Sequence, residues 1–134
     1  MISSTHKRGL GAAAVLAAML AGCVSPHGAG GQGAKDYLEY TAASDPTDNV
    51  VENIRACWFQ GNRPAFAGLS YTPESYANHP RVLIVPRSDP TGLPKLVVDI
   101  NGTQVRAYGP LLGTSEGPTI TQNLQKWIAG GSGC

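Results

Sequence analysis

Two apolar stripes at helical spacing, on either side of a group of β-branched runs, constrain this fold more than any other feature. The first stripe, at i, i+4, i+7 and i+8, consists of Val50, Ile54, Cys57 and Trp58, widened by Val51. The second consists of Ile120, Leu124, Trp127 and Ile128. This spacing predicts two amphipathic helices. We expect Trp58 to pack in the core rather than to stack on a ligand.

Local signals set the ends of both helices. Residues 44–46, Ser-Asp-Pro, supply a cap and a proline before the first stripe, and Gly61 ends that helix in a Gln-Gly-Asn turn. Thr114 or Ser115 is the expected cap of the second helix, with Pro118 in its first turn. Glu52, Asn53 and Arg55 lie off the first stripe.

The β-branched runs between the stripes predict strands. Residues 81–86 form a short unbroken run, typical of a strand that is central or covered on both faces. Residues 95–100 and 103–108 flank Asn101-Gly102, a strong hairpin signal. A two-residue turn there gives one apolar and one mixed face, and its predicted cross-strand pairs are Ile100 with Thr103, Val98 with Val105 and Leu96 with Ala107.

Two stretches are less regular. Residues 36–43 fit either a short helix or an aromatic lead-in to the domain, and residues 64–80 allow at most one short strand, near 67–71. Loops on a rigid scaffold carry function more often than cores do. The candidate binding residues are therefore Phe66, Tyr71, Tyr76 and Arg81, which offer rings for stacking and a cation for an anion. Alternatively, these aromatics fold back as a lid over the core.

Two amphipathic helices and a sheet with one apolar face need each other to bury their apolar surfaces. We therefore predict a two-layer α+β domain, in the order helix, three or four antiparallel strands, helix. The chain has 134 residues, which is enough for one small domain, expected over residues 36–134.

Residues 1–22 have the parts of a signal peptide: Lys7-Arg8, an apolar run over 10–20, and a small-residue end. The run is shorter than the roughly 20 residues that span a bilayer. Leu20-Ala21-Gly22-Cys23 resembles the lipobox of bacterial lipoprotein precursors. The resemblance implies cleavage before Cys23 and acylation of its thiol and amino group, and two or three acyl chains anchor a protein stably. A plain signal peptide cleaved near Cys23 is the alternative.

Residues 23–35 then form the lipidated Cys and a Gly-rich tether with a reach of about 20 Å. Val24 stands where enteric lipoproteins carry the Asp that retains them in the inner membrane. We therefore expect a location in the cell envelope, facing the periplasm, at the outer rather than the inner membrane. His27 is interpreted as a solvated tether residue and not as a metal ligand.

The cysteines predict one disulfide. With Cys23 lipidated, Cys57 and Cys134 remain as a pair in an oxidising compartment. The Gly-Gly-Ser-Gly segment 130–133 lets Cys134 fold back onto the first helix. Two alternatives stay open: a buried free Cys57 with an unpaired Cys134, or a bridge from Cys134 to another chain.

The sequence contains no recognisable catalytic set. A phosphate loop, a Cys-x-x-Cys pair and a His metal motif are all missing. We therefore predict a protein that is not an enzyme, with no catalytic residues, metal or cofactor. The mature chain has eight basic and nine acidic side chains without a basic cluster, which disfavours nucleic acid as a partner.

One resemblance concerns the mature domain. A helix with Ile54-x-x-Cys57-Trp58, followed by a three-stranded meander, is similar to the periplasmic C-terminal domains of the TonB and TolA type. The similarity covers about half of the mature chain and implies a fold only. It ends after the strands, where this chain continues into a Trp-bearing helix, and the chain lacks a long periplasmic stalk.

Two classes of function fit these features. The first is a membrane-anchored envelope lipoprotein with a non-enzymatic role in assembling or maintaining a complex, docking an envelope protein through the open sheet face or residues 66–76. The alternative is a binding module for a small ligand or a peptidoglycan fragment, with Tyr71, Tyr76 and Arg81 as contacts.

Overall fold

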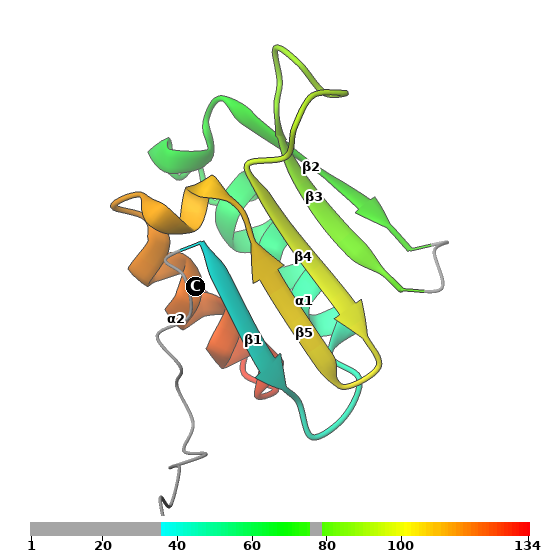
Figure 1. Cartoon of the computed structure of the whole chain (residues 1–134). Coiled ribbons are helices and arrows are strands. Elements are labelled where there is room, and N and C mark those ends of the chain that lie inside the picture. The colour runs from blue at the N-terminus through cyan, green and yellow to red at the C-terminus, as the bar shows by residue number, and fades with distance from the viewer. Residues whose placement is uncertain (1–35, 76–78) are drawn as a thin grey trace, which may run out of the picture.

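The computed structural model describes residues 36–75 and 79–134 (Figure 1). In chain order the elements are β1 (Tyr37–Thr41), α1 (Thr47–Asn53), the π-helix η1 (Ile54–Gln60), the 3-10 turn η2 (Pro64–Phe66), β2 (Leu69–Glu74), β3 (Arg81–Pro86), β4 (Leu96–Asn101), β5 (Gln104–Tyr108), the 3-10 turn η3 (Pro110–Gly113) and α2 (Gly117–Ile128). The lipobox, Cys23, the tether with His27, and Tyr76 lie outside these residues.

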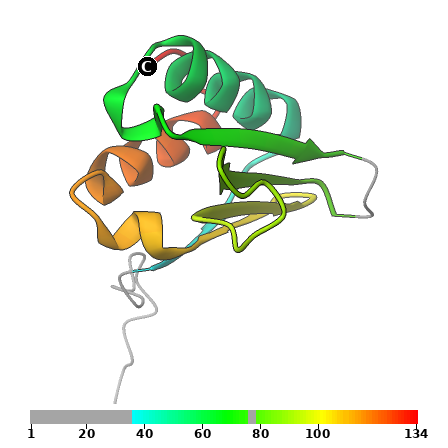
Figure 2. The same ribbon diagram turned by 90° about the horizontal axis from the view of Figure 1, so that it is seen from above.

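The strands form one antiparallel sheet in the order β1-β5-β4-β3-β2. Figure 2 shows α1 and α2 on one side of the sheet, so the predicted α+β class with two helices is confirmed. The predicted count of three or four strands was wrong, because residues 36–43 contain β1. That strand precedes the first helix and pairs at the sheet edge with β5.

The core lies between the helices and the inner face of the sheet. Both predicted stripes are buried in it, with Val51 partly buried at the margin. The ring centroids of Trp58 and Trp127 are 5.2 Å apart, so the two helices meet through their tryptophans. The sheet side of this core consists of Val82, Ile84, Leu96, Val98, Ile100, Val105 and Ala107.

The predicted hairpin register was wrong by two residues. Ile100 pairs with Val105 rather than with Thr103, because the turn residues are Gly102 and Thr103. Only Gly102 needs a positive φ, at 59°, as in the type II′ turn with glycine first. A shift of two residues keeps every side chain on its predicted face, so the prediction of one apolar face is confirmed.

Two further boundaries are the start of α1, which a local interaction supports, and the end of β2. The Asp45 carboxylate accepts hydrogen bonds from the Thr47 hydroxyl and from its N–H, and these bonds lower the pKa of Asp45. They support the start of α1 one residue after Pro46. The short strand expected near 67–71 is β2 and extends further, to Glu74.

The C-terminal tail, residues 130–134, lies along the first helical segment, which consists of α1 and η1. Three residues of this segment, spaced four apart, hold the tail. Nδ2 of Asn49 donates to a tail carbonyl at 2.8 Å. Oδ1 of the buried Asn53 accepts from a tail N–H at 2.8 Å. Cys57 forms the predicted disulfide with Cys134, with the two Cα atoms 5.3 Å apart.

Membrane-spanning segments are not found among the helices of residues 36–75 and 79–134, since none is long and apolar enough.

Removing the disulfide should destabilise the domain strongly. The bridge joins residues 77 positions apart, and constraining a loop of that size in the unfolded chain stabilises by about 4 kcal/mol. We expect reduction to lower the urea midpoint of the wild-type protein to that of Cys57→Ala/Cys134→Ala. The double variant is the control, since reductant should leave its midpoint unchanged. An equal midpoint for oxidised and reduced wild type would contradict the prediction.

Candidate functional site

The structure does not bring the predicted binding residues together. Phe66 is buried, and Tyr71 is partly buried on the inner side of β2. Both rings contact Phe59, with centroid separations of 5.6 and 4.9 Å. Arg81 lies on the other side of the sheet, at the start of β3. For Phe66 and Tyr71 the packing agrees with the alternative in which the aromatics fold against the core.

The sheet face opposite the helices carries a row of alternating charges across all five strands. The pairing of neighbouring strands places these residues side by side in the order Glu39, Arg106, Asp99, Arg81 and Glu74. Adjacent strands are about 4.8 Å apart, so the row is about 19 Å long. We call this the charged row; it contains three acidic and two basic side chains.

Ion pairs hold both arginines of the charged row. Nε of Arg106 donates to the Glu39 carboxylate at 3.3 Å, and Arg81 pairs with Glu74. These hydrogen bonds raise the pKa of both guanidinium groups, and the charge of Asp99 between them acts in the same direction. Both arginines therefore keep their positive charge at physiological pH, and the alternation is fixed.

A second row on this face is largely apolar. Tyr37 pairs with Tyr108, which is followed across the sheet by Val97 and Leu83. The two tyrosines are 37% and 40% exposed. This face therefore offers accessible aromatic surface directly beside the charged row, a combination suited to contact with another protein.

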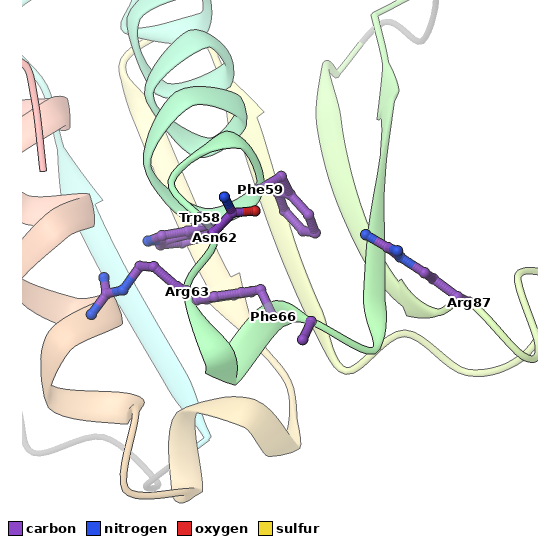
Figure 3. Close-up of a pocket in the computed structure, with 7 residues that line it drawn as sticks. Trp58, Phe59, Asn62, Arg63, Phe66 and Arg87 are labelled. Atoms are coloured by element: carbon purple, nitrogen blue, oxygen red, sulfur yellow. The ribbon is translucent and has the colours of Figure 1, made fainter.

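A separate pocket of about 210 Å³ lies where η1 ends (Figure 3). It is lined by Trp58, Phe59, Asn62, Arg63, Phe66, Ala67 and Arg87. We call it the Arg63–Arg87 pocket. It is smaller than the roughly 300–1,000 Å³ of sites for drug-sized ligands, and its size suits a single ring or a short side chain.

Stacked aromatic rings form the apolar part of the pocket. The Trp58 and Phe66 rings are nearly parallel, with centroids 5.0 Å apart and an interplanar angle of 7°. Phe59 meets Phe66 edge-on and is only partly buried. Because Trp58 also packs on Trp127, the core holds these rings in place.

Hydrogen bonds fix both cations of the pocket. The side-chain amide of buried Asn123 is oriented so that its oxygen faces two N–H donors. This oxygen accepts from Nε1 of Trp58 at 3.0 Å and from Nη1 of Arg63 at 3.3 Å. Nε of Arg87 donates to the carbonyl of Leu69 at 2.8 Å. Figure 3 shows the Arg87 guanidinium directed toward Phe59, and Arg63 on the other side of the rings.

A tight turn shapes one wall of the pocket. A Cβ at Gly61 would lie 2.7 Å from the carbonyl oxygen of Cys57, which is too close for any other residue without a shift. Asn62 follows with a φ of 51°, a left-handed conformation that Asn tolerates better than most side chains. This turn lets the chain leave η1 and place Arg63 beside the rings.

Arg63, Arg87 and Asn123 were not identified from the sequence. Arg63 follows the predicted turn and Arg87 directly follows the predicted strand, but no periodic pattern links them. Within residues 36–75 and 79–134, no three His, Cys, Asp or Glu side chains gather closely enough to hold a metal ion.

Comparisons with protein-family models, with curated proteins and with solved structures find no match for this chain. The lipobox and the similarity to the TonB and TolA type therefore stay predictions.

A methyl group at Gly61 should destabilise the protein, because it must displace the η1 backbone. We expect Gly61→Ala to lower the free energy of unfolding by about 1–3 kcal/mol. Gly68→Ala is the matched control: a Cβ there meets nothing within 4 Å, so its stability should stay equal or rise by up to about 1 kcal/mol. Chemical denaturation measures both, and equal effects at the two sites would contradict the prediction.

Proposed function

We propose that this protein is a lipid-anchored protein of the bacterial cell envelope whose domain docks an envelope protein partner without catalysing a reaction. The lipid on Cys23 holds it at a membrane, preferably the outer one, and the domain faces the periplasm. The observation that carries the docking role is the charged row beside the exposed tyrosines on the outer sheet face.

The chemistry of this face favours a protein as the partner. Three acids and two bases leave the charged row with a small negative charge, which does not attract phosphate groups of nucleic acid or anionic lipid. The matching surface is one whose acidic and basic side chains also alternate. A partner displaced by one strand, about 4.8 Å, would meet like charges, so the alternation disfavours that displacement.

Crosslinking in intact cells tests the location of the docking surface. We expect a photo-crosslinking side chain at Tyr108, on the outer face, to give one defined protein adduct. The same side chain at exposed Lys126, on α2, is the control and should not give that adduct. The same adduct from both positions would count against docking through the sheet.

A charge swap tests the charged row itself. Glu39→Arg with Arg106→Glu keeps the cross-strand ion pair and the net charge but reverses the order of charges at one end of the row. We expect stability to fall by up to about 1 kcal/mol, because the new carboxylate at position 106 lies opposite Asp99, and the Tyr108 adduct to fall at least about tenfold. An undiminished adduct in the swapped protein would show that the charged row does not select the partner.

The anchor has its own test. In cells fed a labelled fatty acid, we expect wild-type protein to carry the label and to sediment with membranes. Cys23→Ser should lose both properties, because the acyl chains supply the membrane affinity. Membrane association of unlabelled wild-type protein would contradict lipidation at Cys23.

The second candidate function, binding of a small ligand or a peptidoglycan fragment, is favoured by a different observation. Tyr71 and Arg81 lie on opposite faces of the sheet, so we do not assign them to one ligand site. The Arg63–Arg87 pocket supports this function instead, because it combines aromatic surface with two cations.

A further inference from the structure

The Arg63–Arg87 pocket holds positive charge that no acidic side chain of the protein balances. The ion pairs of the domain involve Arg55, Arg81 and Arg106. Every Asp and Glu of the sequence lies within the described residues, and none of them is within ion-pair distance of Arg63 or Arg87. None lines the pocket either. A ligand that supplies a negative charge would therefore complete the site.

The pocket differs in this respect from the wider hollow of about 420 Å³ beside α1. That hollow also contains an arginine, Arg81, but Asp48 and Glu52 line it too. Arg81 is in addition paired with Glu74. An anion entering the hollow would meet two carboxylates, whereas an anion in the Arg63–Arg87 pocket meets none.

Both guanidinium groups are held in place with donors to spare. A guanidinium has five N–H donors, and one of those on Arg87 is used by the Leu69 carbonyl. One of those on Arg63 is used by Asn123. These bonds fix the groups and leave further N–H groups on each. A pre-fixed arginine loses little freedom when it binds a carboxylate through two parallel hydrogen bonds.

The apolar surface beside these donors defines the rest of the ligand. Phe59 is only partly buried, and the Arg87 guanidinium is directed toward it (Figure 3). The buried Phe66 ring packs against Phe59 and stacks on Trp58. A flat or branched apolar body packs against such rings. The volume of about 210 Å³ limits that body to the size of one ring.

We propose that the Arg63–Arg87 pocket binds a small organic carboxylate, whose carboxylate contacts the Arg87 guanidinium and whose apolar body packs against Phe59, the pocket ring that is only partly buried. Arg63 adds a second positive charge on the other side of the rings. The site does not depend on the docking proposal, since none of its residues belongs to the charged row. The two proposals can therefore fail separately: a partner is crosslinked while no carboxylate binds, or a carboxylate binds while no partner is crosslinked.

Benzoate is the probe, because it has one ring and one carboxylate. It is titrated into the mature chain with Cys23→Ser, which keeps every residue of the domain, and followed by NMR of the backbone amides and the Trp58 indole. We expect saturable shifts at Trp58, Phe59 and Arg87 with a Kd of about 1 mM or tighter. Benzamide has the ring without the charge and acetate the charge without the ring, so each should bind at least about tenfold more weakly.

Arg87→Gln tests the anion contact and keeps a side-chain donor for Leu69. We expect it to weaken benzoate binding about tenfold to a hundredfold, the loss expected for a charge-assisted pair of hydrogen bonds. Arg55→Gln is the matched control: Arg55 lies on η1 together with Trp58 and Phe59 and pairs with Glu52, and its removal should leave the Kd unchanged.

Three results would overturn the proposal: no saturable shift in the pocket up to about 20 mM benzoate, equal affinity for benzamide, or an unchanged Kd in Arg87→Gln. Equal affinity for benzamide would mean that the pocket is only an apolar cavity. The comparison of the three probes uses the Cys23→Ser chain alone, so the proposal stays testable if Arg87→Gln proves unstable.

Discussion

The packing of the first helical segment against α2 is the contact on which the rest of the structure depends. Trp58 and Trp127 meet at its centre, and Asn49, Asn53 and Cys57 fix the C-terminal tail along its edge. The apolar sheet face is covered only while both helices stay in place. For a domain of this size, whose core alone supplies limited stability, a covalent link between the two helical segments is a substantial contribution.

The same contact creates the pocket. The buried Trp58 packs on Trp127 and stacks on Phe66 beneath the pocket, and Asn123 joins its indole to Arg63. The pocket thus combines the buried Trp58 and Phe66 with the exposed Asn62, Ala67 and Arg87. Pre-fixed groups of this kind raise affinity by lowering the entropy lost on binding. A pocket of modest volume therefore suits the small ligand that we propose.

The outer sheet face is independent of this arrangement. Its side chains alternate with the core residues along each strand, so the inner positions secure the fold while the outer ones are free to vary in charge. The charged row spans residues from position 39 to position 106 and exists only because the five strands are in register. The proposed docking surface and the proposed ligand pocket therefore occupy separate parts of one small domain.

The sequence by itself determined both helices, β3, the hairpin and the apolar sheet face, because periodic burial is a local property of the chain. It also predicted the pairing of Cys57 with Cys134, which the structure confirms. Tertiary structure decided the edge position of β1, the register of the hairpin, the burial of Asn53 and the placement of Arg63 and Arg87 on opposite sides of the aromatic rings. These depend on which backbone groups find partners across the fold, and on side chains from segments that no periodic pattern connects. The hairpin shows the difference clearly: alternation fixed which side chains face the core, but only the conformation of Gly102 fixed which residues are opposite one another.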